Sequence, residues 1–184
     1  MPVKKILQYP RDEAKLRKKS AAVKRLDADV KLLITDLKDT LATQAGAGLA
    51  AVQIGVLQRV ALVRFGQDQG EMEPPLAIIN PVILERGPLV DSFDGCLSIP
   101  KLYTWDSPRP SWLMFKARDE HWNEIRMRVE GADASVVDHE VDHMNGMLFL
   151  DRLAEGAQLY VPRRDENGEE KLVPLASAIS RQSP

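Results

Sequence analysis

The segment His139-Glu-Val-Asp-His143 carries residue types that could do metal chemistry. A helix is predicted here by the apolar side chains of Val136, Val137, Val141 and Met144 and by the Asn145-Gly146 pair that follows. On a helix, two histidines at positions i and i+4 project from one face and can bind one metal ion. The Glu140 carboxylate could then reach a water on that ion, as metal-assisted hydrolysis requires. The alternative is an ordinary polar helix face, so a further ligand must be sought elsewhere in the chain.

The elements that must position this segment are predicted by apolar periodicity and turn residues. An extended arm over 1–26 precedes an amphipathic helix over 28–44, with Asp27 as its N-cap. Gly46 and Gly48 lie just beyond that helix, where a glycine at positive φ can close it. Strands are predicted over 59–65 and 76–84, with an edge or a bulge where Asn80-Pro81 interrupts the second.

A hairpin is predicted over 111–118 and 124–130, with His121 in its turn as a surface residue. Together these elements predict an α+β fold in which antiparallel strands pack around a central HExxH-bearing helix. We expect a single domain over 1–184, with a tail from about 154 to 184 that forms a hairpin near Asn167-Gly168 instead of a terminal helix.

Composition restricts the classes of protein that remain. The 184 residues are 44% hydrophobic and 28% charged, which is typical of a globular protein. The formal net charge of -2 provides no global field that would recruit nucleic acid or an anionic membrane, and no apolar run is long enough to span a bilayer. One cysteine excludes an internal disulfide framework and favours a reducing compartment. We therefore expect a cytoplasmic protein.

The third ligand is best supplied by the segment Asp94-Gly-Cys-Leu-Ser98. A lone cysteine is more often a small buried hydrophobic residue, but a catalytic site with two histidines needs one more protein ligand, and a Cys96 thiolate would provide it. No further histidine follows the HExxH helix, so the metzincin pattern is excluded. Glu155 is the nearby thermolysin-like alternative, although it is closer to the helix than that pattern expects.

The run from Gly46 to Gly55 is dominated by small residues with one amide, Gln53, among them. Small residues let the backbone approach another strand or a ligand closely. Alternatively, the run is a helix end followed by a tight crossing, with Gln53 bonded to a neighbouring loop. A dinucleotide site is excluded because these glycines follow a helix and the G-x-G-x-x-G pattern is incomplete.

Three motifs in order resemble those of the peptide deformylases. They are Gly46-Ala-Gly-Leu-Ala-Ala-Val-Gln53, Asp94-Gly-Cys-Leu-Ser98 and His139-Glu-Val-Asp-His143. The resemblance extends from the arm at Leu7-Gln-Tyr-Pro10 to Leu148-Phe-Leu-Asp-Arg152 and fades beyond Leu153. It implies a hydrolase that removes the formyl group from N-formyl-methionine of newly synthesised chains.

The resemblance also implies the roles of individual residues. Cys96, His139 and His143 would hold one divalent ion, Fe(II) in many family members, with zinc, nickel or cobalt as alternatives. Glu140 would act as the base, while the Gln53 amide and the Leu97 backbone N–H would stabilise the oxyanion. The backbone at Gly46 and Gly48 would lie beside the peptide, and Val136 would line the methionine pocket.

The partners implied are N-formylated nascent peptides, with the ribosome as one place of encounter, and neither nucleic acid nor membrane. Both a monomer and a homodimer remain open.

Some residues depart from the family pattern. Asp94 stands where the family usually has Glu, Asp138 replaces the usual Gln, and Tyr103 falls near a position that is commonly Arg. These departures leave open a deformylase-like amidase with a different N-acyl substrate and a catalytically silent homologue. From position alone, Asp142 is predicted to orient a partner such as Arg109.

Overall fold

The computed structural model describes residues 3–67 and 73–180. The helices include α1 (Glu13–Leu16), α2 (Ala28–Leu41), α3 (Gly131–Met144) and α4 (Leu175–Ser180), with the 3-10 helices η1 (Ala51–Ile54) and η3 (Phe149–Arg152). The strands include β1 (Gly48–Ala50), β2 (Val60–Val63), β3 (Leu76–Arg86), β4 (Leu89–Cys96), β5 (Ile99–Pro110), β6 (Trp112–Arg118), β7 (Glu124–Glu130), β8 (Leu159–Arg164) and β9 (Glu170–Pro174).

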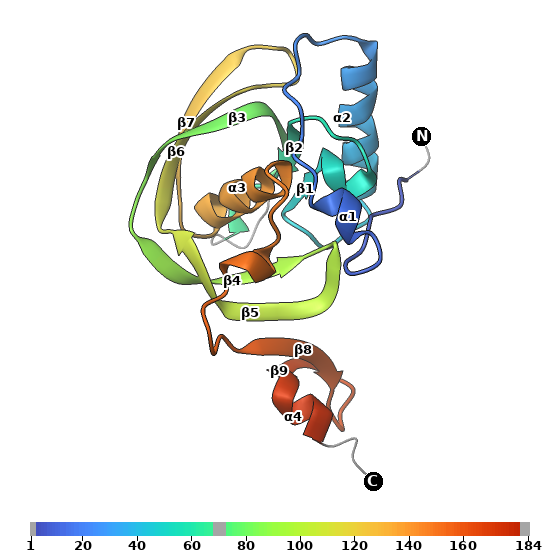
Figure 1. The fold of residues 1–184 in the computed structure, drawn as a ribbon, viewed down its shortest axis with the longest axis vertical. Helices are drawn as coiled ribbons and strands as arrows, with labels where there is room; N and C mark the ends of the chain where they lie inside the picture. Colours follow the sequence, from blue (N-terminus) through green and yellow to red (C-terminus); the bar gives the residue numbers. More distant parts are fainter. Residues whose placement is uncertain (1–2, 68–72, 181–184) are drawn as a thin grey trace.

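Two antiparallel sheets surround α3, the helix that bears the HExxH segment. The larger sheet has the strand order β1-β2-β3-β6-β7, and the smaller has the order β4-β5-β8-β9. Helix α3 contacts strands of both sheets. In Figure 1, β3, β6 and β7 curve around one side of α3 and β4 and β5 pass below it. The predicted α+β fold with antiparallel strands around this helix is confirmed.

Strand β2 lies between two apolar clusters of the core, and both of its faces are buried. Ala61 and Val63 pack in the cluster around α3, whereas Val60 and Leu62 pack in the cluster that includes the apolar side of α2. Successive side chains of a strand point to opposite faces, so one short strand joins both clusters. Helix α2 begins as predicted, with the Val30 N–H donating a hydrogen bond to the Asp27 carboxylate at 3.1 Å.

Other local predictions are also confirmed. Asn80 takes a positive φ of 51°, and the pairing of β3 with β6 shifts register between Ile79 and Val82, so a bulge lies where one was expected. Strands β6 and β7 pair in register from Trp112 and Glu130 to Arg118 and Glu124. His121 lies in the turn between them and is exposed.

The prediction that Gly46 or Gly48 closes α2 at positive φ was wrong. The helix ends at Leu41, and its C-cap Ala42 is still right-handed, with its N–H bonded to Lys38 O at 3.0 Å. Gly48 lies in β1 opposite Val63 and has extended backbone. The chain needs no left-handed residue here because it leaves the helix through further right-handed turns before entering the strand.

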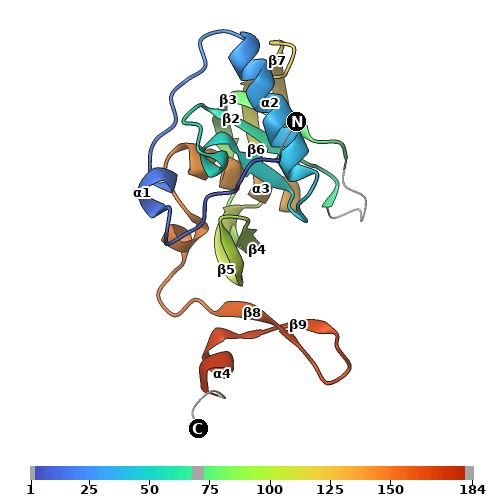
Figure 2. The ribbon, with the colours of Figure 1, turned by 90° about the vertical axis from the view of Figure 1, so that its right-hand side faces the viewer.

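The predictions for the two ends of the chain were partly wrong. The arm before α2 contains the one-turn helix α1, whose Leu16 side chain is fully buried. In the tail, β8 and β9 form the predicted hairpin with Gly168 at φ 81°, but α4 follows it. Both helices are too short for apolar periodicity to reveal them. Figure 2 shows the β8–β9 hairpin and α4 lying beyond β4 and β5, away from the larger sheet.

None of the helices within 3–67 and 73–180 is long and apolar enough to cross a membrane.

Candidate metal centre

The side chains of His139, His143 and Cys96 converge between α3 and the end of β4. His139 Nε2 lies 3.1 Å from His143 Nε2, which lies 3.2 Å from Cys96 Sγ. One ligand atom from each residue falls within 4.8 Å of the other two, and Cys96 and both histidines are at most 9% exposed. The i and i+4 spacing of the HExxH pattern therefore places both imidazoles beside the Cys96 thiol. Cys96 comes from a strand that lies 43 or more residues earlier in the chain.

The chemistry of these donors fits a divalent ion. Asp94 Oδ1 lies 2.8 Å from His139 Nδ1, so this nitrogen carries the proton and donates, and Nε2 presents its lone pair. Once His139 Nε2 is deprotonated, two imidazole lone pairs and a sulfur face one another at about 3 Å and repel unless a cation lies between them. Histidine and cysteinate are ligands for Zn and for the other divalent transition metals.

The pKa values of the two histidines differ because only one has an acidic partner. Burial lowers the pKa of His139, but the charge and hydrogen bond of Asp94 outweigh it, so the net direction is upward. Burial and the nearby His139 and Arg109 charges hold the pKa of His143 well below its usual value, which keeps that ring neutral. Metal binding must therefore displace a proton from His139.

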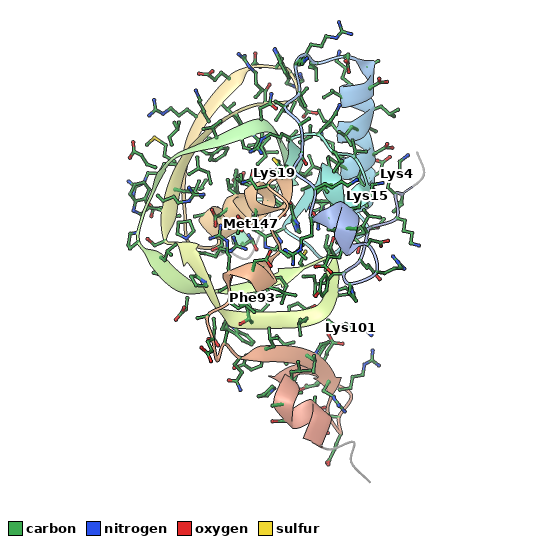
Figure 3. All side chains as sticks on the ribbon, in the orientation of Figure 1. Lys4, Lys15, Lys19, Phe93, Lys101 and Met147 are labelled. Carbon is green, nitrogen blue, oxygen red and sulfur yellow. The ribbon has the colours of Figure 1, made fainter. Side chains whose placement is uncertain are left out.

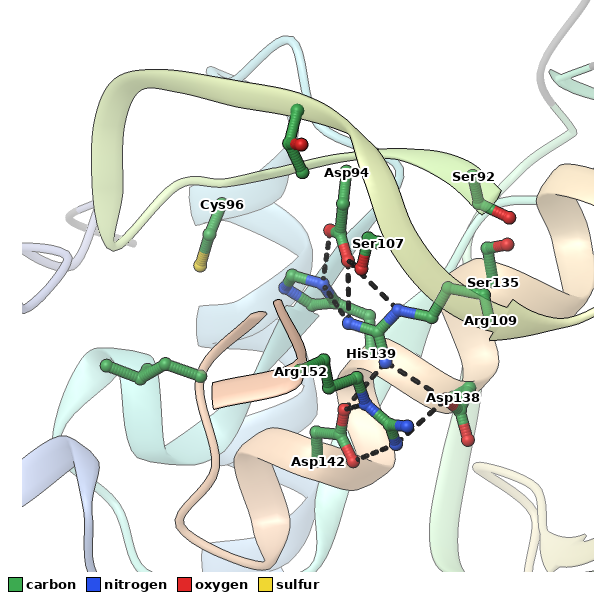
Figure 4. Close-up of polar contacts among 12 residues, drawn as sticks. Ser92, Asp94, Cys96, Ser107, Arg109, Ser135, Asp138, His139, Asp142 and Arg152 are labelled. Carbon is green, nitrogen blue, oxygen red and sulfur yellow. Dashed lines mark hydrogen bonds and ion pairs between the residues drawn. The ribbon is translucent and has the colours of Figure 1, made fainter. Parts of the chain in front are cut away.

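Arg109 is the centre of a buried ion-pair network that fixes His139. Its Nε and Nη2 donate to Asp94 Oδ2 at 2.9 and 2.7 Å, and its Nη1 donates to Asp142 at 2.6 Å and to Asp138 at 2.9 Å. The Arg109 side chain is fully buried. Figure 4 shows these contacts joining β4 and β5 to α3. The predicted pairing of Asp142 with Arg109 is confirmed.

Sequence reasoning missed the outer half of this network. Arg152 of η3 bonds both Asp142 and Asp138, and Arg86 of β3 bonds Asp138 at 3.0 Å. Three guanidinium groups thus balance three buried carboxylates. In the sequence, Asp138 stands out only as a departure from the family pattern. No signal in the sequence indicates its partners, because they lie 14 to 52 residues away on other elements.

Glu140 lies beside the converging ligands, where a base is needed. Its carboxylate is 3% exposed, and Oε2 has no hydrogen-bond partner among the described residues. Burial raises the pKa of Glu140 to about 7. A carboxylate with this pKa can both accept and return a proton near neutral pH.

A cleft of about 940 Å³ opens onto this centre. It is lined by the following residues, each of which was predicted for the site: Gly46, Gly48, Gln53, Cys96, Leu97, Val136, His139 and Glu140. His143 lies behind its surface with no exposed area. The alternative ligand Glu155 is exposed in the turn after η3 and is not part of the cluster.

Gln53 is held with its amide nitrogen toward the thiol. Its Oε1 accepts a hydrogen bond from the Ala50 N–H at 2.7 Å, while Nε2 lies 3.2 Å from Ser98 Oγ and 3.7 Å from Cys96 Sγ. Ser98 lies in the turn between β4 and β5, so Gln53 bonds a neighbouring loop, as the alternative expected, and it also lines the cleft.

A helix-borne pair of histidines, a cysteine from a strand and a buried glutamate in one cleft define a metal-dependent hydrolase of the HExxH class. The family model for polypeptide deformylase matches residues 3–158. The chain belongs to the peptide deformylase family and is a hydrolase.

Known peptide deformylases align with this chain over nearly their full length. The peptide deformylase of Thermomicrobium roseum is 38% identical over 162 residues, covering 86% of this chain and 92% of the relative. Peptide deformylase 1 of Clostridium acetobutylicum is 39% identical over 155 residues, covering 84% of this chain and 97% of the relative. The solved peptide deformylase structure from Thermotoga maritima has a TM-score of 0.75 at 31% identity and covers 84% of this chain and 99% of its own. The solved peptide deformylase structure from Legionella pneumophila has a TM-score of 0.73 at 35% identity, and the match covers 84% of this chain and 88% of that structure's chain.

Proposed function

We propose that this protein removes the formyl group from N-formyl-methionine at the start of newly synthesised polypeptides. The observation that carries the proposal is the convergence of Cys96, His139 and His143 beside Glu140, in a chain of the peptide deformylase family. These three residues would hold one divalent ion, for which we propose Fe(II). Such an ion supplies Lewis acidity, lowering the pKa of a water and polarising the formyl oxygen.

Glu140 is the group that moves the proton. Its buried carboxylate accepts a proton from the attacking water as the new C–O bond forms at the formyl carbon. The same carboxylic acid then donates that proton to the amine nitrogen as the C–N bond breaks. The products are formate and a peptide with a free amino terminus, so atoms and charge balance.

Two donors are proposed to stabilise the oxyanion that develops on the formyl oxygen. The Gln53 amide nitrogen is oriented by the bond from Ala50 to its oxygen, so it needs little reorganisation. The second donor is the backbone N–H of Leu97, the residue that follows Cys96 and lines the same cleft.

The peptide is proposed to lie beside β1, which stands at the edge of the larger sheet. A β-carbon at Gly46 would lie 3.0 Å from Leu97 Cδ1, and one at Gly48 would overlap Glu140. The absence of side chains here thus keeps the strand close to the catalytic residues. Val136 lies one turn before His139 on the cleft surface, where it is proposed to contact the methionine side chain.

The shorter Asp94 does not weaken this proposal. It still reaches His139 with one oxygen and Arg109 with the other, so the contacts that orient the ligand are made. We propose nascent peptides in the cytoplasm, at the ribosome or after release, as the substrates.

The experiment that tests the proposal is formate release from a formyl-Met peptide by protein prepared without oxygen and loaded with Fe(II). Glu140→Gln should bind the metal and lose turnover, whereas Cys96→Ser should lose both. The exposed Glu155→Gln is the matched control and should behave as the parent protein. If the metal-loaded protein released acetate from acetyl-Met peptide faster than formate, the different N-acyl specificity would replace the proposed one. If it cleaved neither peptide, the reading as a catalytically silent homologue would replace the proposed function.

A further inference from the structure

The arm that precedes α2 bonds both of the segments that carry the proposed oxyanion donors. The Leu7 N–H donates a hydrogen bond to the main-chain carbonyl of Gln53 at 2.7 Å. Two residues further along, the Tyr9 N–H donates to the carbonyl of Ser98 at 2.8 Å. Gln53 belongs to η1, and Ser98 lies in the turn between β4 and β5. A stretch of three residues in the arm therefore joins η1 to the β4–β5 turn.

The same arm also bonds the end of α3. The Ser20 N–H donates to the carbonyl of Met144 at 2.8 Å, in the last residue of the helix that bears both histidines. Figure 3 labels Lys4, Lys15 and Lys19 along this arm, on the side of the molecule where α1 lies. All three segments that build the site are thus bonded to the arm through backbone N–H groups, which every residue except proline provides.

A side-chain contact closes the ring that Leu7 and Tyr9 begin. Gln53 Nε2 lies 3.2 Å from Ser98 Oγ, and the Ser98 N–H lies 3.4 Å from Cys96 Sγ. Gln53 is 2% exposed and Ser98 is fully buried. Hydrogen bonds that form a buried, fully bonded network rigidify the groups that they join. The main chain of Gln53 is therefore fixed by the arm, while its side chain is fixed by the β4–β5 turn.

The spacing of the two proposed donors matters because both must face one oxygen atom. Gln53 and Leu97 lie 44 residues apart in the sequence. η1 directly follows β1 of the larger sheet, whereas the β4–β5 turn belongs to the smaller sheet. Oxyanion donors must lie about 3 Å from the developing charge, and a displacement of about 1 Å can cost about 100-fold in rate. A contact that spans the two sheets is therefore needed to set their spacing, and the arm is such a contact.

We propose that the arm positions the two oxyanion donors. Through the N–H groups of Leu7 and Tyr9, it holds η1 and the β4–β5 turn at the spacing that one oxygen atom requires. Leu7 and Tyr9 are not among the described residues that line the cleft, so they act through the donors and not on the substrate. This inference rests on the proposed function, because it takes Gln53 and the Leu97 N–H to bind the formyl oxygen in the transition state.

The test compares Leu7→Pro with Leu7→Ala on the metal-loaded full chain. Both variants lose the leucine side chain, but only proline also removes the N–H that bonds Gln53. We expect the kcat of Leu7→Pro for formyl-Met-Ala-Ala to be about 10- to 100-fold below that of Leu7→Ala, with KM changed much less, because an oxyanion contact is made only in the transition state. Metal content should be the same in both variants. Equal kcat values would overturn the proposal.

A double-mutant cycle separates positioning from a general disturbance of the fold. Once Gln53→Ala has removed the donor, Leu7→Pro and Leu7→Ala should have the same kcat. If Leu7→Pro caused the same loss in the Gln53→Ala protein as in the parent, Leu7 would not act through Gln53, and the proposal would be wrong.

Hydrogen exchange of the Ala50 amide gives a readout without catalysis, because this amide donates to Gln53 Oε1. It should exchange faster in Leu7→Pro than in Leu7→Ala, and the Leu7 and Tyr9 amides of the parent protein should exchange slowly. Leu7 and Tyr9 amides that exchanged as in an unfolded chain would overturn the proposal, even if Leu7→Pro did not fold. If these exchange results held but the parent protein released no formate, the proposed function would fail while the arm would still be shown to fix Gln53.

Discussion

The carboxylate of Glu140 lies against the backbone of Gly48 so closely that a β-carbon on Gly48 would fall 2.2 Å from Glu140 Oε1. Any other residue at position 48 must displace either β1 or the proposed base. The glycine of the strand and the acid of the helix therefore form one structural unit.

Gly48→Ala is expected to lower kcat/KM by roughly 100-fold, since small displacements of catalytic groups have effects of that size. The metal content should stay at that of the parent protein, because the ligands do not touch Gly48. Gly46→Ala is the matched comparison and should lose less, because its β-carbon meets only the flexible end of Leu97 at 3.0 Å. Steady-state kinetics with metal analysis checks both, and equal losses would contradict the steric explanation.

Glu140→Gln is expected to stabilise the metal-free protein at high pH. Burial raises the pKa of Glu140 from 4.5 to about 7, so ionising it in the folded protein costs about 3 kcal/mol at 1.36 kcal/mol per pH unit. For an acid whose folded pKa is raised, this cost is absent below pH 4.5, grows between pH 4.5 and 7, and is complete above pH 7. Urea unfolding of both proteins should therefore differ by about 3 kcal/mol at pH 8 and very little at pH 4. A difference independent of pH would contradict the assignment.

Asp94→Asn is expected to weaken metal binding by about 10- to 100-fold, the usual effect of losing a carboxylate that orients a histidine ligand. The amide can present either its oxygen or its nitrogen to His139 Nδ1, and Arg109 loses an anionic partner. Competition with a chelator measures the affinity. Asp106→Asn, at a carboxylate of the neighbouring strand β5 that accepts a hydrogen bond from the Gln158 N–H, should leave metal affinity unchanged.

Arg109→Ala is expected to lower the free energy of unfolding by about 3–5 kcal/mol, the cost of leaving buried carboxylates without their partner. Asp94, Asp138 and Asp142 would then share only Arg86 and Arg152, neither of which is bonded to Asp94. Arg128→Ala removes an exposed arginine paired with Glu130 and should change stability by less than about 1 kcal/mol. Denaturant unfolding of the two variants tests the difference, and similar values would show that the buried network adds little.

Local patterns in the sequence predicted the elements that depend on near neighbours. The i and i+4 histidines, the Asp27 cap, the bulge at Asn80 and the hairpin around His121 all follow from spacing or turn chemistry within one element. Cys96 required more, because a lone cysteine has no informative spacing. Cys96 is predicted as a ligand because a catalytic site with two histidines needs one more protein ligand.

Contacts between distant elements could not be predicted in the same way. The role of Gly48 depends on where Glu140 lies in three dimensions, so the sequence suggested a helix cap when the structure has a close crossing. Arg86 and Arg152 resemble surface arginines in sequence, yet each bonds the buried Asp138. Tyr160 and Phe93 lie 67 residues apart in the sequence, yet the Trp105 ring contacts both.

β1 pairs with β2 alone among the described strands, so its other edge presents backbone donors and acceptors that no described strand pairs, apart from the Ala50 N–H, which donates to Gln53. A strand edge of this kind offers hydrogen bonds to features that every polypeptide has, whatever its side chains. A protein that must act on the products of many different genes gains generality from such a surface. Selectivity is then confined to the few places where side chains meet the ligand, and inhibitors with an extended backbone could exploit the shared part.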